Sequence, residues 1–126
     1  MSFDIEAFGL NQSQRDAVLW ENGPVLVLAG PGSGKTRVLT CRIVRLIDAS
    51  PDERFRVLGI TFTNKAASEM RQRIDAMLAQ GRDRVTITTF HSFAAEILRQ
   101  HGSHSGLRPD FSILTEPADR EEALTD

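Results

Sequence analysis

LAGPGSGKTRV, residues 28–38, decides the fold class, because it sets a glycine-rich turn between an apolar run and a helix. The preceding run, PVLVLA (24–29), is continuous and apolar, which is typical of a strand buried on both faces of a parallel sheet. Glycines let successive backbone N–H groups point at one centre, and a helix that begins near Gly34 adds the positive end of its dipole. Lys35 brings a cation to the outer phosphates, and the Thr36 hydroxyl suits Mg²⁺. The stretch therefore predicts a P-loop that binds a nucleoside triphosphate with Mg²⁺.

One position departs from the P-loop pattern G-x-x-x-x-G-K-[ST], because Ala29 stands where the first glycine belongs. A methyl group is tolerated there if the backbone φ is negative. Ser33 lies inside the loop, and its surroundings lack the G-x-S-x-G pattern of a hydrolase nucleophile. The alternative interpretation is a plain glycine-rich turn between a strand and a helix. The residues predicted to surround the phosphates, with Lys35 and Thr36 as the catalytic pair, are Ala29, Gly30, Pro31, Gly32, Ser33, Gly34, Lys35 and Thr36.

Further strands are predicted on the carboxyl side of the loop. VLGITF (57–62) has the apolar composition of a second buried strand, and VTITTF (85–90) alternates apolar residues with threonine as a third. FSIL (111–114) is expected to form a short fourth strand, and Pro117 to open a last helix. Because helices separate the first three strands, right-handed crossovers would make the sheet parallel, with the following segments at one edge. The predicted fold is α/β, a parallel sheet flanked by helices in an incomplete domain.

The helices between these strands are predicted from caps and from apolar spacing. Asn11, with Gln14 three residues later, indicates a capping box for a helix that ends near Trp20. Asn64 is expected to cap the helix after the second strand, and Gly81 to end it. The residues expected on the inner faces of the three long helices are Leu39, Ile43, Leu46, Ile47, then Ala67, Met70, Ile74, Met77, Leu78, then Phe93, Ala94, Ile97 and Leu98.

Composition limits the class of protein. The 126 residues are 40% hydrophobic and 25% charged with a net charge of −2, which describes an ordinary globular domain rather than a cationic nucleic-acid binder. The single cysteine, Cys41, excludes an internal disulfide and favours a reducing compartment, so we expect a cytoplasmic protein. MSFDIEAFG (1–9) lacks the apolar run of a secretory leader, and no stretch approaches the length of a membrane span, so no membrane partner is expected. His101 and His104, with Cys41 distant, do not have the spacing of a zinc site.

Four stretches closely resemble, in order and spacing, the UvrD/Rep family of superfamily 1 DNA helicases: LNQSQRDAV, LAGPGSGKTRVL, ITFTNKAASEMRQRI and TITTFHSFAAEILR. TFTNKAA and TFHS are more specific than the P-loop, since a small-molecule kinase has a P-loop without them. The resemblance covers nearly the whole chain. It implies a RecA-like motor domain that couples ATP hydrolysis to translocation along single-stranded DNA, usually 3′ to 5′. It also implies that residues 1–126 are the N-terminal part of that domain, motor domain 1A.

The resemblance assigns nucleotide roles to two residues outside the loop. Gln14 matches the adenine-reading glutamine of the family, whose amide offers both a donor and an acceptor to the base edge. A role in helix capping is the alternative, and the two roles are compatible. Arg37 matches the nucleotide-side arginine of the family, with a solvated helix residue as the alternative. ATP with Mg²⁺ is the implied cofactor, and Thr36 is the implied metal ligand.

The first DNA-contacting motif that the resemblance implies is TFTNKAA. Phe62 would stack on a base, and Thr63 and Asn64 would contact phosphates from a helix N-terminus. A core position at the end of a strand is the alternative for Phe62. The cations that either add positive potential here or form a solvated face are Lys65, Arg71 and Arg73.

The second implied DNA motif is TTFHS. Thr89, His91 and Ser92 would donate hydrogen bonds to the sugar–phosphate backbone. The alternative for His91 is a helix cap or a packed imidazole. Phe90 and Phe93 are expected in the core.

Hydrolysis requires groups that this sequence does not contain. The family takes an acidic pair from a D-E-x-x-[QD] strand and an arginine finger from a second motor domain, and D-E-x-x-[QD] does not occur in residues 1–126. We therefore expect the enzyme to be the full-length ATP-dependent DNA helicase, and this piece alone to be inactive in turnover. The expected partners are single-stranded DNA, ATP and the remaining helicase domains, in DNA repair or replication. Two alternatives stay open: a piece of a helicase–nuclease subunit, and a truncated protein that binds nucleotide or single-stranded DNA without unwinding.

Overall fold

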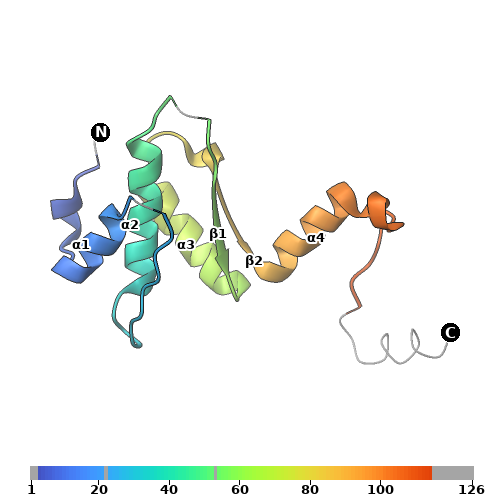
Figure 1. Ribbon diagram of the computed structural model, residues 1–126, viewed down its shortest axis with the longest axis horizontal. Coiled ribbons are helices and arrows are strands. Elements are labelled where there is room, and N and C mark those ends of the chain that lie inside the picture. Colours follow the sequence, from blue (N-terminus) through green and yellow to red (C-terminus); the bar gives the residue numbers. More distant parts are fainter. Residues whose placement is uncertain (1–2, 22, 53, 115–126) are drawn as a thin grey trace. The chain divides into compact units, whose positions relative to one another are not determined.

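The computed structural model describes residues 3–21, 23–52 and 54–114 (Figure 1). The chain divides into two compact units, Met1–Phe90 and His91–Asp126. The elements of the first unit are η1 (Ile5–Phe8), α1 (Gln12–Leu19), α2 (Lys35–Asp48), β1 (Val57–Thr61), α3 (Asn64–Met77), η2 (Arg82–Arg84) and β2 (Val85–Thr89). α4 (Phe90–His101) starts at the boundary and continues into the second unit, where η3 (Gly102–Ser105) follows it.

β1 and β2 form a parallel pair in which Val57 lies opposite Val85 and Thr61 lies opposite Thr89. α3 connects the two strands and packs on both. This confirms the second and third predicted strands, each one residue shorter than expected, and the α/β character of the chain. Because the strands are parallel and their ends are in register, the segments after Thr61 and Thr89 begin side by side at one edge of the sheet (Figure 1).

The apolar run 24–29 is not a strand, which corrects the prediction made from its composition. Among the residues that the structure describes, the sheet consists of β1 and β2 alone. Leu26 and Leu28 are 82% and 85% exposed. A run of this kind becomes a strand when neighbouring strands pair with its N–H and C=O groups, and an unpaired strand is not stable in water. The apolar pattern shows that the run is suited to a strand, but the strand forms only where a neighbouring strand pairs with it.

FSIL (111–114) is also not a strand, and Ile113 and Leu114 are exposed. It has no ladder partner in the described part of the chain, so the same physical reason applies to it as to residues 24–29. The helix predicted to open at Pro117 lies outside the described residues.

α2 lies between two groups of buried side chains in the first unit. α3 and β2 cover one side of it, and α1 covers another. Because two neighbours cover this helix, its buried face is wider than the predicted stripe. Of that stripe, Ile43 and Ile47 are buried, whereas Leu39 is exposed. Burial raises the pKa of the Cys41 thiol. The buried groups are Ile43, Val44, Ile47, Met70, Ile74, Leu78 and Val85 on one side, and Leu10, Ala17, Val18, Val38 and Cys41 on the other.

The predicted capping box of α1 is confirmed. The backbone N–H of Gln14 donates to Asn11 Oδ1 at 3.0 Å, and the backbone N–H of Asn11 donates to Gln14 Oε1 at 2.9 Å. The cap of α3 corrects the prediction by one residue. Thr63, not Asn64, is the N-cap, because its backbone is extended and its hydroxyl accepts from the N–H of Ala66 at 3.1 Å.

The carboxyl end of α3 also differs from the prediction. The helix ends at Met77, and Gly81 instead precedes η2 with a φ of +76°. A Cβ at Gly81 would lie 2.6 Å from Ile47 Cγ2, so glycine is required there both by the backbone and by the core.

The inner face predicted for α4 is mostly exposed. Ala95 is the buried residue of this helix, whereas Ala94, Ile97 and Leu98 are exposed and Phe93 is half-buried. The spacing correctly predicts a helix, but a helical pattern does not show what covers the helix. The three predicted inward residues are therefore wrong as core positions among the described residues.

Candidate functional site

The glycine-rich loop meets α2 at Gly34, which has a φ of +81° and serves as the N-cap without a side-chain hydrogen bond. Gly32 also has a left-handed backbone, with a φ of +72°. Inside the loop, the Ser33 hydroxyl donates to the Gly30 carbonyl at 2.6 Å, so Ser33 stabilises the turn rather than facing a substrate. The first bond of α2 runs from the N–H of Val38 to Gly34 O at 3.0 Å. The backbone N–H groups before Val38 in the first turn of α2 have no carbonyl partner inside the helix, and such groups are suited to binding an anion.

Lys35 reaches back across the loop. Its Nζ donates to the carbonyl oxygens of Ala29 at 2.8 Å and Gly30 at 3.0 Å. An ammonium group has three N–H donors, which leaves one for a phosphate oxygen. No non-glycine residue in the described ranges has a positive φ, so Ala29 meets the condition under which a methyl group replaces the first glycine. Thr36 is exposed in the first turn of α2.

Gln14 connects α1 to this loop. Its Oε1 accepts from the N–H of Asn11, and its Nε2 donates to the carbonyl of Ser33 at 2.9 Å. The amide orientation follows from these partners, since a donor faces the oxygen and an acceptor faces the nitrogen. An amide has two lone pairs and two N–H groups, so one acceptor and one donor position remain for a base edge. A Cβ at Gly34 would lie 3.0 Å from Gln14 Nε2, so glycine allows this close approach.

A hollow of about 170 Å³ lies beside this connection. Its walls come from α1, from residues 27–29 and from the start of α2, and they combine apolar side chains with the polar groups of Gln14 and Lys35. This mixture is typical of a site for a small organic ligand. A larger hollow of about 470 Å³ lies around Ile47 and Gly81, far from the loop, and lacks its glycine-rich backbone. We therefore assign the candidate nucleotide site to the smaller hollow and the loop.

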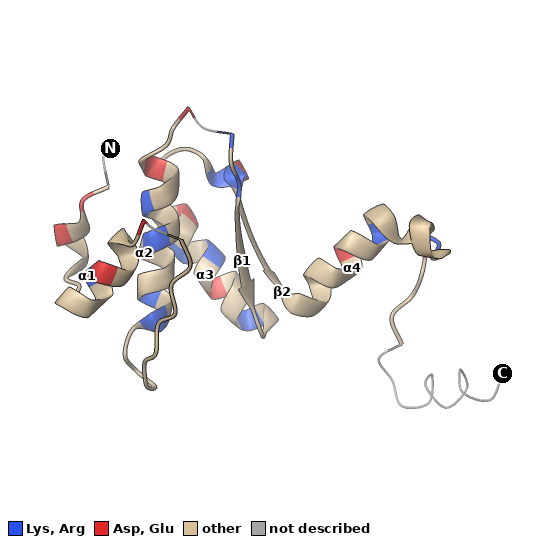
Figure 2. Ribbon diagram, viewed as in Figure 1, with Lys and Arg blue, Asp and Glu red and all other residues tan. Residues whose placement is uncertain are grey.

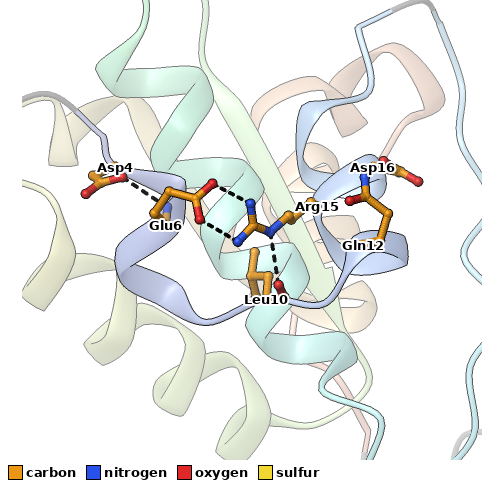
Figure 3. A network of polar contacts seen from close by, with 6 residues as sticks. All are labelled: Asp4, Glu6, Leu10, Gln12, Arg15 and Asp16. Atoms are coloured by element: carbon orange, nitrogen blue, oxygen red, sulfur yellow. Dashed lines mark hydrogen bonds and ion pairs between the residues drawn. The ribbon is translucent and has the colours of Figure 1, made fainter.

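Two arginines and a glutamate support this region, and sequence patterns missed the glutamate and one arginine. Arg37 donates through Nη2 to the carbonyl of Phe8 in η1. Arg15 contacts both carboxylate oxygens of Glu6, with Nη2 2.6 Å from Oε2, and donates through Nε to Leu10 O at 3.0 Å (Figure 3). The hydrogen bond from Arg15 lowers the pKa of the Glu6 carboxyl and raises the pKa of the guanidinium. No sequence pattern predicts the contact between Glu6 and Arg15, which lie nine positions apart.

Phe62 and Phe90 form an exposed aromatic pair at the carboxyl ends of β1 and β2. Their ring centroids are 5.4 Å apart with an interplanar angle of 41°. Phe62 is 87% exposed, which excludes the core position considered for it. Phe90 is 51% exposed, so its predicted place in the core is wrong. The register that sets Thr61 opposite Thr89 brings these two rings together.

The polar residues of the two edge motifs differ in accessibility. The Thr63 side chain caps α3, and the Thr61 hydroxyl donates to Thr63 O at 3.0 Å. Thr89 is buried at the end of β2. The polar members of the two motifs that are exposed are Thr63, Asn64, Lys65, His91 and Ser92.

Of the cations near these motifs, Arg71 has a structural position. Its Nε donates to Asp75 Oδ2 at 3.0 Å, and its Nη1 donates to the carbonyl of Val85 at 2.5 Å. Arg71 therefore joins α3 to β2. Arg73 is exposed, so a contribution of its charge to the surface potential stays a prediction. Figure 2 shows the cations of the first unit distributed over several elements, interspersed with acidic residues.

No helix in the described ranges is long and apolar enough to cross a membrane. The sequence profile of the UvrD/REP helicase N-terminal domain matches residues 10–125. Three bacterial relatives, each named ATP-dependent DNA helicase PcrA, are 47% identical over 122 residues (Leuconostoc citreum), 48% over 106 residues (Bacillus subtilis) and 41% over 117 residues (Staphylococcus aureus strain Mu50). The alignments cover 95%, 84% and 93% of this chain but 16%, 14% and 16% of those relatives. The profile match includes the loop, the Gln14 connection and both edge motifs, and the chain belongs to the UvrD/Rep helicase family.

Proposed function

We propose that this chain is the N-terminal part of a RecA-like motor domain, domain 1A, of an ATP-dependent DNA helicase that couples hydrolysis to 3′–5′ translocation on single-stranded DNA. One observation carries the proposal. α2 begins, and β1 and β2 end, at the same end of the first unit (Figure 1). The glycine-rich loop and the aromatic pair therefore share one edge of one compact unit. The names of the relatives support this activity for a parent protein, since the chain spans about 14–16% of their length.

In this proposal the loop holds the phosphates of ATP. Backbone N–H groups of the loop and of the first turn of α2 surround the phosphates, with Pro31 as the one loop residue that has no N–H to donate. Lys35 turns its third N–H toward an outer phosphate oxygen. Thr36 fits Mg²⁺, because its hydroxyl is a hard oxygen donor and is exposed in the first turn of α2. When bound, Mg²⁺ neutralises phosphate charge. Gln14 offers its remaining donor and acceptor to adenine, and Arg37 flanks the nucleotide from the same turn as Lys35.

Single-stranded DNA would contact the aromatic pair. Every base has a π-face, so stacking on Phe62 tolerates any sequence, as a translocating protein requires. Thr63 and Asn64 at the start of α3 suit phosphate contacts, and the first turn of α4 offers His91 and Ser92 to the sugar–phosphate backbone. Thr89 belongs to the same motif and is the least accessible member.

Turnover would require an acidic pair and an arginine finger beyond those motifs. The D-E-x-x-[QD] pattern is absent from residues 1–126, so we expect this piece to bind ATP weakly without hydrolysing it efficiently. A helicase–nuclease subunit shares the motifs described, and a nuclease assay on the whole parent protein separates the two activities. The cytoplasmic location and the role in repair or replication stay predictions.

Binding of a fluorescent ATP analogue with Mg²⁺ to the 126-residue chain tests the nucleotide site. Lys35→Ala removes the point charge at the outer phosphates and should weaken binding by at least about tenfold, because a charge-assisted hydrogen bond contributes about 1.5–3 kcal/mol. Arg54→Ala is the control. It removes a cation from an exposed position in the segment before β1, away from the loop, and should leave the affinity unchanged.

Equal affinity of the Lys35→Ala variant and the unaltered chain would contradict the P-loop assignment. A loss in both variants would indicate attraction by overall charge instead of a site built around Lys35.

A further inference from the structure

We propose that Glu6 and Arg15 are positioning residues for Gln14 and thereby set how strongly the site prefers adenine over other bases. The inference rests on the proposed nucleotide function and adds to it two residues to which the family resemblance assigns no role. The Arg15 guanidinium joins three segments of the N-terminal region: α1, the residue Leu10 before it, and Glu6 of η1 (Figure 3).

Arg15 directly follows Gln14 in the first turn of α1. Its two terminal nitrogens contact the two carboxylate oxygens of Glu6 in η1, and its Nε donates to Leu10 O at 3.0 Å. A two-point contact between a planar guanidinium and a carboxylate fixes direction as well as distance. Both the turn that precedes α1 and the first turn of α1 are therefore held against η1.

η1 is itself fixed to α2 by contacts that do not involve Glu6. The rings of Phe3 and Phe8 stack with centroids 5.2 Å apart, and the N–H of Phe3 donates to Asp48 Oδ2 at 2.5 Å. Arg37, in the first turn of α2, donates to the carbonyl of Phe8. Glu6 is thus a reference point attached to the helix that follows the loop.

These contacts close a ring around the candidate site. From α2 the connection runs through η1 to Glu6, then to Arg15 and to Gln14, whose Nε2 donates to the carbonyl of Ser33 in the loop. The loop returns to α2 at Gly34. The plane of the Gln14 amide, which aims its remaining donor and acceptor, therefore depends on where Glu6 holds the first turn of α1.

The ring separates base contacts from phosphate contacts. The Lys35 ammonium bonds to the carbonyl oxygens of Ala29 and Gly30. The Arg15 guanidinium bonds instead to Glu6 and to the carbonyl of Leu10. Weakening the Glu6–Arg15 contact should consequently alter recognition of the base and leave recognition of the phosphates unchanged. A residue that acted through folding alone would reduce both.

The test compares three ligands with Mg²⁺: ATP, inosine triphosphate and inorganic tripolyphosphate. Inosine carries an acceptor at the place of the adenine amino group, and tripolyphosphate has no base. Dissociation constants are measured for the 126-residue chain and for Glu6→Gln, Arg15→Lys and Gln14→Ala. We expect Glu6→Gln and Arg15→Lys to lower the preference for ATP over inosine triphosphate by about threefold to tenfold, the size of one modest hydrogen bond. Tripolyphosphate affinity should not change.

Gln12→Ala is the matched control. Gln12 lies in the same helical turn and donates through Nε2 to Asp16 Oδ1 at 2.7 Å, on the outside of α1 (Figure 3). Its removal should leave all three affinities unchanged. The double variant Glu6→Gln with Gln14→Ala should lose no more ATP preference than Gln14→Ala alone, because Glu6 acts through Gln14.

Four outcomes decide between the claims. No binding of any ligand by the unaltered chain would overturn the P-loop proposal and this inference with it. Binding without a preference for ATP would overturn the role of Gln14, and the positioning role as well. A preference for ATP that survives in both Glu6→Gln and Arg15→Lys would overturn the positioning role alone. So would an equal loss of ATP and tripolyphosphate affinity, which indicates a general structural role.

Discussion

The two sides of the candidate site are built in different ways. On the nucleotide side, polar side chains are held by the protein itself: Gln14 bonds to Asn11 and Ser33, and Lys35 bonds to the carbonyls of Ala29 and Gly30. On the other side, the Phe62 ring lies 87% exposed against Phe90. The first arrangement fixes donors at set positions, and the second offers a surface.

This difference fits two kinds of ligand. A triphosphate has a fixed pattern of charge, and donors that are already oriented bind it without a further cost in side-chain entropy. A single strand that moves past a protein presents a changing series of bases, and an open aromatic face accepts each of them. We therefore expect substitutions on the nucleotide side to disturb geometry, and substitutions at the aromatic pair to remove contact area.

The largest effect is expected from Gly34→Ala. The alanine would have to adopt a left-handed backbone, which costs about 1–2 kcal/mol for an L-residue. Its Cβ would also lie 3.0 Å from Gln14 Nε2. Both the free energy of unfolding and ATP binding should fall, with binding reduced by at least about tenfold because the loop and Gln14 are displaced together. Chemical denaturation and nucleotide titration measure the two quantities.

Gly106→Ala is the control for backbone strain. Gly106 has a φ of +78° and no atom within 4 Å of an added Cβ, and it lies in the second unit. It should lower the free energy of unfolding by a similar amount without changing ATP affinity. Unchanged ATP affinity in Gly34→Ala would contradict the link between Gln14 and the loop.

Phe62→Ala follows in size. Loss of a stacked base should weaken binding of a labelled single-stranded oligonucleotide by about 1–3 kcal/mol. The free energy of unfolding should change by no more than about 0.5 kcal/mol, because an exposed side chain contributes little to the core. Fluorescence anisotropy measures the affinity, and Leu19→Ala, an exposed apolar residue on α1, serves as the control. Equal affinities for the Phe62→Ala and Leu19→Ala variants would remove the aromatic pair from the DNA surface.

Thr63→Ala tests how much the N-cap of α3, directly after Phe62, contributes to the free energy of unfolding. The substitution removes the hydroxyl that accepts from the N–H of Ala66 and should lower the free energy of unfolding by about 1 kcal/mol, the usual contribution of an N-cap. Asn64→Ala should have a smaller effect on unfolding, since Asn64 is the first helical residue and not the cap. A reversed order in thermal or chemical denaturation would restore the cap predicted from sequence.

Local patterns predicted the parts of the molecule that local residues determine. The capping box depends on Asn11 and Gln14, three positions apart, and the loop depends on glycines within five positions. β1 and β2 were also predicted, from their own apolar and alternating compositions, and each has the other strand as its ladder partner. The capping box and the loop need no information from distant residues, whereas the two strands also need the pairing that each provides for the other.

The wrong predictions share a different cause: a local pattern does not show which residue or strand lies next to the segment in the fold. Residues 24–29 have the composition of a strand, but a strand requires a partner that composition does not reveal. Phe90 has the apolar character of a core residue, yet it lies beside Phe62 at the exposed edge. Glu6 and Arg15 have no shared period or motif, so their contact emerged from the fold alone.

The smallest effect concerns that pair and depends on pH. The hydrogen bond from Arg15 holds the pKa of the Glu6 carboxyl below its ordinary value of 4.5. A carboxyl whose pKa is lowered by folding contributes stability above its unfolded pKa and loses it as the pH falls through the folded pKa. The stability difference between the unaltered chain and Glu6→Gln should therefore be constant near neutral pH and disappear in acid. Because both side chains are accessible to solvent, the difference should be small and should shrink with added salt.

Carbon-13 NMR of the Glu6 carboxyl measures this titration directly. Arg15→Ala should return the pKa of Glu6 toward 4.5, whereas Gln12→Ala should leave it unchanged, since Gln12 bonds to Asp16 instead. A Glu6 pKa of 4.5 or above in the unaltered chain would mean that the two-point contact does not persist in solution. The fixed geometry of the nucleotide side would then begin at the capping box of α1, with η1 a separate turn, and its contrast with the open aromatic pair would be smaller than the structure indicates.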